Sequence, residues 1–301
     1  MGKNLKKRAL IINAVRKFFN LNGYLEIETP VRIPAPAPEA HIDSFKSEKW
    51  YLQSSPELCM KRVAASGYEK IFQICKCFRK DERGDRHLTE LTMLEWYTKG
   101  DTYMDLMDQC RNLIKFIAKE TGSKESICYN NLNINLAESW QKISVEQAFA
   151  EYSKISMDQA VLQKKFDEIM SFDIEPNLGI QKPCFIFDYP SSMAALAKLK
   201  KNNNKLAERF ELYIAGIELA NGFSELTDPD EQRIRFEKEM TIRDKFGKAA
   251  SPMPEKFLEE LGNMPETAGI ALGIDRLVML FTNSLSIDEV VAFTPEELCE
   301  L

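Results

Sequence analysis

Residue types that would indicate a zinc site, a membrane span or a secreted protein are scarce in this 301-residue chain. It has two histidines, His41 and His87, and its seven cysteines form no C-x-x-C pair, so we do not expect zinc. No stretch approaches the roughly 18 consecutive apolar residues of a membrane helix. Asn13, Arg16 and Lys17 break the apolar run of the basic N-terminus, which argues against a signal peptide. These absences predict a cytoplasmic protein with reduced cysteines.

The chain also has no excess of positively charged residues. The chain has 40 lysines and arginines against 46 aspartates and glutamates, a formal net charge of −6, so its overall field does not attract nucleic acid. Hydrophobic residues make up 44% of the sequence, enough to bury a full core, and no low-complexity linker divides it. We therefore predict a single domain over residues 1–301, with a helical insertion at about residues 101–180.

The first hundred residues mix helical and strand patterns. Apolar residues recur at steps of three and four over residues 4–21, which predicts an amphipathic helix. Periodicity, with proline and glycine as breakers, predicts the elements that follow. They are a strand over 24–29, an extended proline-rich loop from Pro30, a short strand near 50–53, a helix starting at Ser55-Pro56-Glu57, and strands over 71–78 and 89–97.

The rest of the chain is predicted to be mainly helical up to about residue 170 and then mixed. In FELYIAGIELANGF, Ala215-Gly216 is placed to turn one strand into the next. Residues 229–248 form a charged helical pattern, and in GIALGIDRLVMLF a glycine-spaced strand is expected to pass into a helix.

A heavily charged segment lies between two of the expected strands, FRKDERGDRHLTELTMLEWY, from Phe78 to Tyr97. Its loop holds three arginines, Arg79, Arg83 and Arg86. Because the planar fork of an arginine side chain suits phosphate oxygens, the loop indicates a site for a nucleotide triphosphate. A solvated hairpin whose charges pair with one another stays open as an alternative on this segment alone.

The strand that follows this loop carries polar groups on one face. A period of two over residues 89–97 places four side chains on the same side: Leu91, Met93, Glu95 and Tyr97. A carboxylate and a phenol beside apolar residues suit a ligand that has a flat ring and an amine. We therefore expect this face to form the floor of a ligand site.

Two glutamates, Glu211 and Glu218, flank the Ala215-Gly216 turn. If the two strands pair directly across that turn, both carboxylates project from one face of the hairpin. With no balancing cation nearby in the sequence, they suit a hard divalent ion such as Mg²⁺. Two exposed strand glutamates remain the alternative. Arg276, in GIALGIDR, stands at a glycine-lined helix start where backbone can approach a ligand closely.

Taken as an ordered set, these motifs resemble a known family. The helix and strand ending at Pro30, then FR…H…E…MLEWY, then GIDR resemble motifs 1, 2 and 3 of class II aminoacyl-tRNA synthetases. SSPELCMKR and GIELANGFSELTD are similar to the lysyl-tRNA synthetase branch. FDYPSSMAALAK, with a chain that starts directly at motif 1, resembles the elongation factor P–(R)-β-lysine ligases over essentially all 301 residues. The resemblance implies an α+β fold: the class II catalytic core, an antiparallel sheet flanked by helices.

The resemblance also implies an ATP site. Arg79 matches the motif 2 arginine, which contacts the α-phosphate and the amino acid carboxylate, and Arg276 matches the motif 3 arginine, which lies against ATP; both are the expected catalytic residues. The other implied ATP contacts are Asp81 or Glu82 at the adenine amino group, His87 near the triphosphate, Leu91, Gly273, and Glu211 with Glu218 as the Mg²⁺ pair. Leu91 stands where the family has a phenylalanine, so about 0.5–1.5 kcal/mol of ring stacking is expected to be missing.

An acidic pocket for the amino acid follows from the same resemblance. The implied substrate contacts are Glu57 and Glu95 at the backbone amine, Asn221 near the carboxylate, Tyr97 and Glu225 at the distal ammonium, with Ser55 and Ala271 beside them. Lysyl-tRNA synthetases carry glycine where this chain has Ala271, and the ligases carry alanine. One added methyl group is expected to favour the isomer whose amine sits one carbon further along, by roughly 1–3 kcal/mol.

The implied reaction has two steps. β-Lysine, or lysine, reacts with ATP in the presence of Mg²⁺ to give an aminoacyl-adenylate, and a lysine side chain of elongation factor P then attacks it. Motif 1 implies a homodimer. Two alternatives stay open: activation of α-lysine for tRNA or another carrier, which the start at motif 1 without an anticodon-binding domain disfavours, and a catalytically inactive module that senses an amino acid or binds a partner. The phosphate arginines and the metal carboxylates are all present, which argues against the second.

Overall fold

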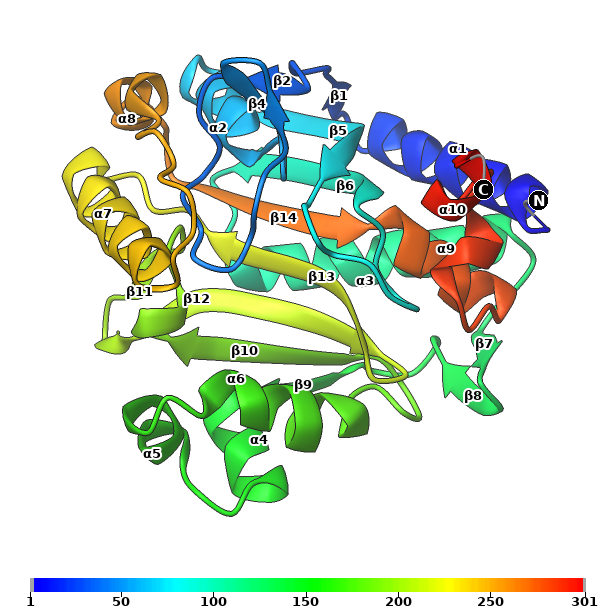
Figure 1. Ribbon diagram of the computed structural model, residues 1–301. Helices are drawn as coiled ribbons and strands as arrows, with labels where there is room; N and C mark the ends of the chain where they lie inside the picture. The colour runs from blue at the N-terminus through cyan, green and yellow to red at the C-terminus, as the bar shows by residue number, and fades with distance from the viewer. Residues whose placement is uncertain (1–2, 300–301) are drawn as a thin grey trace.

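The computed structural model describes residues 3–299, and its centre is a nine-stranded sheet (Figure 1). The neighbouring strands are, in order, β1 (Leu25–Glu26), β5 (Lys70–Phe78), β6 (Glu90–Lys99), β14 (Thr267–Gly273), β13 (Ile217–Ser224), β12 (Asn203–Ile214), β10 (Cys184–Pro190) and β9 (Gln141–Ser144), with β11 (Leu199–Lys200) paired to β12. The pairs from β5 to β10 are antiparallel, and the two outermost pairs are parallel. The expected α+β fold with a mainly antiparallel sheet is confirmed.

Three helices cover one face of this sheet: α1 (Leu5–Leu21), α3 (Tyr103–Glu120) and α9 (Ile274–Thr282). The apolar stripe predicted for residues 4–21 is the buried face of α1, which packs against α3. Thr102 and Asp105 form a capping box that starts α3 and satisfies its first backbone donors. This face is sealed by the largest apolar cluster of the chain, so a ligand site has to lie on the other one.

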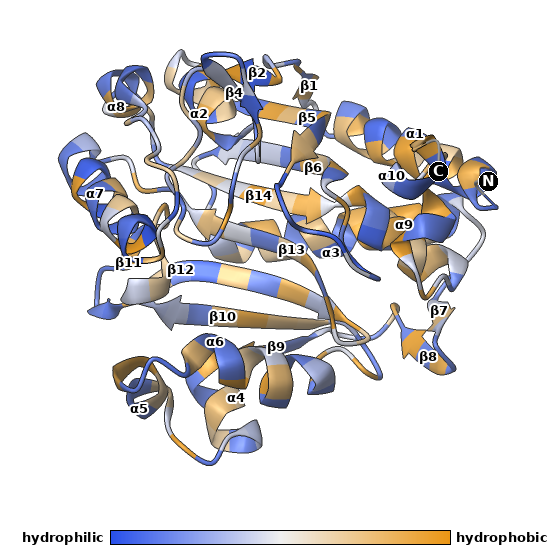
Figure 2. Cartoon of the chain, in the orientation of Figure 1, coloured by the Kyte–Doolittle hydropathy of each residue, from blue (hydrophilic) through white to orange (hydrophobic). Residues whose placement is uncertain are grey.

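Smaller layers complete the fold. A second apolar cluster lies between β9–β10 and α4 (Val145–Tyr152), α5 (Met157–Leu162), α6 (Phe166–Ile169) and the π-helix η1 (Met170–Ile174). A third lies under α2 (Glu57–Ala65), α7 (Pro229–Lys245) and α8 (Glu255–Leu261). Figure 2 shows α7 as mostly hydrophilic on the side in view, as its charged sequence predicts. The remaining elements are β2 (Arg32–Ile33), β3 (Lys46–Ser47), β4 (Trp50–Leu52), β7 (Ser126–Tyr129), β8 (Leu132–Asn135), η2 (Glu175–Asn177), η3 (Ser191–Met193), η4 (Ile287–Val290) and α10 (Pro295–Leu298).

Some local expectations need correction. The region 101–180, expected to be mainly helical, holds α3 to α6 and η1 but also contains the β7–β8 hairpin and β9, and β9 pairs in parallel with β10. Strand partners that lie far along the chain decide such short strands, and no local pattern reveals them. The loop after Pro30 includes β2, which pairs with β4, and the strand expected over 24–29 shortens to β1. The division into a single domain stays a prediction. None of the helices within residues 3–299 is long and apolar enough to cross a membrane.

Candidate active site

Strand β14 shows how the sequence separates the two faces of the sheet. Three of its residues, Ala268, Ile270 and Leu272, belong to the helix-covered core. Between them stand three small residues that line a cavity on the other face: Gly269, Ala271 and Gly273. The glycine spacing of GIALG therefore has a spatial reason, because small residues leave room above the strand while their neighbours fill the core.

The cavity over this face has a volume of about 460 Å³. All four side chains predicted to share one face of the strand after the charged loop line it, which confirms that period-two reading: Leu91, Met93, Glu95 and Tyr97. Most other expected site residues also line it: Ser55, Glu57, Arg79, Glu82, His87, Glu218, Asn221, Ala271, Gly273 and Arg276. Three do not: Asp81, Glu211 and Glu225.

The strand register brings four of these residues into one row. Glu95 of β6 lies opposite Ala271 of β14, Ala271 lies opposite Asn221 of β13, and Asn221 lies opposite Glu211 of β12. Residues in one row of a sheet point to the same side, about 5 Å apart from strand to strand. Four distant sequence motifs therefore meet as neighbours. In this row the methyl group of Ala271 lies between the carboxylate of Glu95 and the side-chain amide of Asn221.

A second row runs parallel to the first. Tyr97 lies opposite Gly269, Gly269 opposite Phe223, and Phe223 opposite Arg209. A Cβ on Gly269 would come within 2.3 Å of both the Tyr97 ring and Oε1 of Glu225. Glycine at this position is thus required for the phenol and the buried carboxylate to stand side by side.

At one end of the cavity the polar groups are acidic and buried. Ser55 Oγ donates to Glu95 Oε1 at 2.5 Å, and the Tyr97 hydroxyl donates to Glu95 Oε2 at 3.0 Å. Burial, and then repulsion from Glu57, raises the pKa of Glu95 to about 8. The carboxylate is fixed in place and forms no ion pair with any residue in the range 3–299, so a ligand ammonium group would stabilise its ionised form.

Sequence reasoning missed a cation at this end, Lys61. Its Nζ lies 2.6 Å from Glu57 Oε1 and 2.6 Å from Glu225 Oε2, and the side chains of Lys61 and Glu225 are fully buried. Burial is the main reason that the pKa of Glu225 rises to about 8. The available sequence signal was the spacing of four residues between Glu57 and Lys61 on α2, which places them on one helix face.

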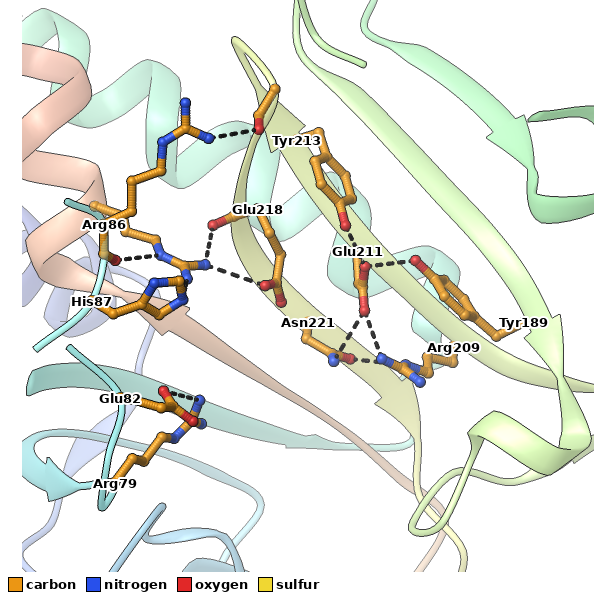
Figure 3. A network of polar contacts seen from close by, with 12 residues as sticks. Arg79, Glu82, Arg86, His87, Tyr189, Arg209, Glu211, Tyr213, Glu218 and Asn221 are labelled. Atoms are coloured by element: carbon orange, nitrogen blue, oxygen red, sulfur yellow. Dashed lines mark hydrogen bonds and ion pairs between the residues drawn. The ribbon is translucent and has the colours of Figure 1, made fainter. Parts of the chain in front are cut away.

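The other end of the cavity is basic and more open. Arg79 Nη1 lies 3.7 Å from Glu82 Oε2 (Figure 3). The Arg79 Nε donates to the Ser54 carbonyl at 3.4 Å. These are long contacts, so the guanidinium keeps donors for a ligand. Asp81 is exposed, has a φ of 65° and does not line the cavity, whereas Glu82 does. Of the two alternatives for the adenine contact, Glu82 is the one that reaches the site.

Arg276 is positioned by the start of α9, just after Gly273. Its Nη1 donates to the Glu218 carbonyl at 2.8 Å and lies 3.2 Å from Glu218 Oε2, and its Nη2 is 2.6 Å from His87 Nε2. Burial and the Arg276 charge lower the pKa of His87. The imidazole is therefore neutral at neutral pH, so it suits a hydrogen bond to a ligand and does not add a positive charge to the site.

Around Glu211 the structure corrects an expectation. The strand register at the turn is as predicted, with Tyr213 opposite Glu218. However, Glu211 has a cation beside it, because Arg209 Nη2 contacts its Oε1 at 2.6 Å. In addition, the hydroxyls of Tyr189 and Tyr213 donate hydrogen bonds to its Oε2 at 2.6 and 2.8 Å (Figure 3). Arg209 lies two residues earlier on the same strand face, a relation that period two reveals once the strand is known. Within residues 3–299 no group of three or more His, Cys, Asp or Glu side chains could hold a metal ion.

Other cavity residues were not predicted. Arg209 and Glu39 line the cavity, as does the segment 193–197 that follows β10. Glu39 lies in the proline-rich loop, which Arg243 of α7 fixes by donating to the Glu39 carbonyl at 2.7 Å. Burial, and then Glu57, raises the pKa of Glu39 to about 7. A loop glutamate carries no local signal of this placement, because a contact across some 200 residues of chain creates it.

Comparison with known proteins identifies the family. A family model described as "tRNA synthetases class II (D, K and N)" matches residues 1–297. A protein of Vibrio atlanticus (strain LGP32) named "Elongation factor P--(R)-beta-lysine ligase" is 38% identical over 308 residues, covering 97% of this chain and 95% of that protein. Proteins of the same name from Pectobacterium atrosepticum and Proteus mirabilis are 36% and 37% identical, covering 97% and 96% of this chain and 95% and 94% of their own. The chain therefore belongs to the elongation factor P–(R)-β-lysine ligase family, within the class II aminoacyl-tRNA synthetases.

Proposed function

We propose that this chain is a ligase that activates (R)-β-lysine, or lysine, with ATP and transfers it to a lysine side chain of elongation factor P. One observation carries the proposal: a single cavity of about 460 Å³ joins a buried acidic end, with Glu57 and Glu95, to a basic end, with Arg79 and Arg276. Carboxylates bind ammonium groups and guanidinium groups bind phosphate groups, and this cavity offers both kinds of partner. The names of the relatives support the same reaction.

In the first step the amino acid carboxylate attacks the α-phosphorus of ATP, and pyrophosphate leaves. Negative charge accumulates on the phosphoryl oxygens, so a fixed guanidinium lowers the barrier. We assign this catalytic role to Arg79, whose contacts to protein are long, and we assign Arg276 to the other side of the nucleotide. The protein supplies no nucleophile. Its contribution is to place the two reactants and to stabilise charge.

Glu218 and Glu211 are the residues that we propose to hold Mg²⁺. Hard carboxylate oxygens suit this ion, and burial together with the neighbouring Glu218 raises the pKa of Glu211, a repulsion that a cation would relieve. Glu218 is the more accessible of the two, because it lines the cavity and Arg276 contacts one of its oxygens at the longer distance of 3.2 Å. When bound, the ion would neutralise phosphate charge.

Specificity for the amino acid is proposed to come from the acidic end. Glu95 and Glu57 would receive the amine near the reacting carboxylate, and Glu225 with Tyr97 would receive the distal ammonium. A substrate without that ammonium leaves Oε1 of the buried Glu225 carboxylate without a hydrogen-bond partner, which is a costly loss. In the second step the amine of the acceptor lysine attacks the adenylate carbonyl carbon, an amide bond forms, and AMP leaves.

The test is a transfer experiment. Labelled α-lysine and (R)-β-lysine are each supplied with ATP to the purified protein, with elongation factor P in one reaction and bulk tRNA in another. We expect label on the factor, with β-lysine preferred, and none on tRNA. Label on tRNA, or a strong preference for α-lysine, favours activation of α-lysine for another carrier. No adenylate with either isomer contradicts the proposal.

We also propose a homodimer formed through α1 and β1. Three leucines on these elements are exposed despite being apolar: Leu10 (54%), Leu21 (69%) and Leu25 (48%). Exposed apolar residues that cluster on neighbouring elements are typical of an interface. Sedimentation of the protein is expected to give a dimer, and Leu10→Glu is expected to shift it to a monomer. For the location we propose the cytoplasm, which fits seven cysteines that form no disulfide.

A further inference from the structure

Lys61 is a rare kind of residue, a lysine with a side chain that is fully buried. It projects from α2 toward the carboxylates at the acidic end and, like Glu225, does not itself line the cavity. Its Nζ lies 2.6 Å from Glu57 Oε1, 2.6 Å from Glu225 Oε2 and 5.1 Å from the centre of the Phe223 ring. A buried cation is retained only where carboxylates or dipoles compensate for lost hydration, and here two carboxylates do so.

The acidic end holds more negative charge than Lys61 can neutralise. Three carboxylates meet there, those of Glu57, Glu95 and Glu225, and each acts on the others. With all three ionised and Lys61 protonated, the net charge of the group is −2 (three negative charges and one positive). Tyr97 stays neutral, because burial and then Glu95 raise its pKa well above the ordinary phenol range. An empty buried site does not sustain two uncompensated charges, so a ligand with two cationic groups fits it.

The contacts also show where the ligand charges would lie. Lys61 takes Oε2 of Glu225, while Oε1 is buried without a hydrogen bond to any described residue. That free oxygen faces Gly269 and the Tyr97 ring, since a Cβ at Gly269 would meet both. Lys61 therefore forms an ion pair with one oxygen of the Glu225 carboxylate, and the other oxygen, on the side of the phenol, has no hydrogen-bond partner among the described residues.

We propose that Lys61 sets the net charge of the acidic end, so that a substrate with two ammonium groups neutralises it. The ammonium group of Lys61 acts there as a third one, and a substrate with one or three ammonium groups does not match the charge that remains. The inference rests on the proposed function and extends it by naming a residue that determines specificity. Lysine and β-lysine each bring two ammonium groups and one carboxylate. An amino acid with a single amine leaves one carboxylate unpaired, and a third amine has no carboxylate left to receive it.

Removing Lys61 changes the titration of Glu95 and Glu225. Glu57, Glu95, Glu225 and Tyr97 face one another there, and Glu39 acts on Glu57 from the loop above. A nearby cation favours the ionised form of a carboxylate, so the loss of Lys61 raises the pKa values of Glu95 and Glu225 further. The ionised form that binds ammonium groups is then reached only at higher pH.

The experiment compares the wild-type protein with Lys61→Met in pyrophosphate exchange from pH 6 to 9. In the variant we expect the KM for the diamino acid at pH 7 to rise by about 10-fold or more and the acid limb of kcat/KM to move up by about one pH unit, while the KM for ATP stays unchanged. Lys99→Met is the matched control, because Lys99 forms an exposed pair with Glu69 at 2.9 Å and lies outside the cavity. We expect the control to behave as wild type.

Chemical rescue separates charge from packing. Lys61→Ala is assayed with added propylammonium, which replaces the missing chain and its charge, and with 1-propanol, which replaces the volume alone. Recovery of the diamine KM with the amine and not with the alcohol supports the proposal. Equal recovery with both, or an unchanged KM and pH profile in Lys61→Met, overturns it.

Two further measurements keep the outcomes distinct. If the Met and Ala variants unfold by circular dichroism, Lys61→Arg, which keeps the charge, is used. A diamine KM near wild type with Arg supports the proposal, and a rise of about 10-fold or more in that KM overturns it. If the wild-type protein forms no adenylate with either lysine isomer, the proposed function fails. The shift in melting temperature that each isomer alone gives to wild type and to Lys61→Met then tests the charge count: a larger shift for wild type supports it, and equal shifts overturn it.

Discussion

The two ends of the cavity are built in opposite ways. At the acidic end Lys61 and Glu225 have fully buried side chains joined by a 2.6 Å ion pair. At the basic end Arg79, Arg276 and Glu218 keep side-chain exposures of 26%, 21% and 37%, and their ion pairs are 3.7 and 3.2 Å long. Burial makes an unmatched charge costly, so the closed end is suited to select a substrate. The open end keeps its guanidinium groups available to a nucleotide that has to enter and leave.

The largest expected effect tests the basic end. Arg79→Ala removes the guanidinium assigned to the reacting phosphate, so pyrophosphate exchange is expected to fall by about 10²–10³-fold. The fold should survive, because Arg79 makes few and long contacts within the protein. The rate is measured in steady state, with circular dichroism as the check on folding.

Arg83→Ala is the control for this variant. Arg83 belongs to the same charged loop but pairs with Glu296 and Asp288 at 2.9 Å, outside the cavity. It should retain activity close to wild type. An Arg79→Ala enzyme as active as the control would remove Arg79 from the reaction.

The acidic end is expected to respond to pH, with a change of about 10-fold per unit where the carboxylates titrate. Glu95 and Glu225 both have pKa values raised to about 8, and only their ionised forms attract ammonium groups. Affinity for the diamino acid should therefore increase from pH 6 through pH 8 and level off about one pH unit above that value, while ATP affinity changes less. Calorimetry of each ligand alone measures this, and Glu225→Gln should weaken diamine binding and flatten the profile.

The same two groups have an opposite effect on the ligand-free protein. A carboxylate with a raised pKa in the folded state contributes stability below its ordinary pKa, and this contribution is lost as the pH rises through the folded value. The free energy of unfolding should thus fall between about pH 5 and 8, and Glu95→Gln should reduce that fall. A profile identical to wild type in Glu95→Gln would show that Glu95 does not titrate in this range.

A smaller change tests discrimination within the acidic end. Ala271→Gly removes the methyl group that stands between Glu95 and Asn221 in the first row of the sheet. The ratio of kcat/KM for β-lysine to that for α-lysine should decrease by roughly 5- to 150-fold, equivalent to about 1–3 kcal/mol. Competition between the two labelled isomers measures the ratio directly, and an unchanged ratio would assign Ala271 to packing alone.

The smallest expected effect returns to the basic end. Leu91→Phe restores the aromatic ring that the family places against adenine, so the KM for ATP should fall by about 2- to 12-fold, equivalent to 0.5–1.5 kcal/mol. The KM for the diamino acid should not change, since Leu91 lies four residues before Glu95 on the strand. A higher KM for ATP in this variant would mean that the cavity has no room for the ring.

Period two and turn chemistry were sufficient to predict the cavity face of β6 and the register at the Ala215-Gly216 turn. They could not predict that Lys61 is buried, because the spacing of Glu57 and Lys61 on α2 is the same whether that helix face is buried or exposed. Nor could they predict the partners of Glu211, since Tyr189 reaches it only after β10 pairs with β12. The strand β9 was missed for the same reason. Local patterns fix which side chains share a face, while the contacts made by that face depend on distant segments.

The most direct measurement is a crystal structure with a non-hydrolysable analogue of the lysyl-adenylate. The account predicts one bound molecule across the cavity, with the sulfamate that replaces the phosphate beside Arg79, the distal ammonium on Oε1 of Glu225, and Lys61 still on Oε2. An analogue bound with its ends reversed, or outside this cavity, would contradict the account.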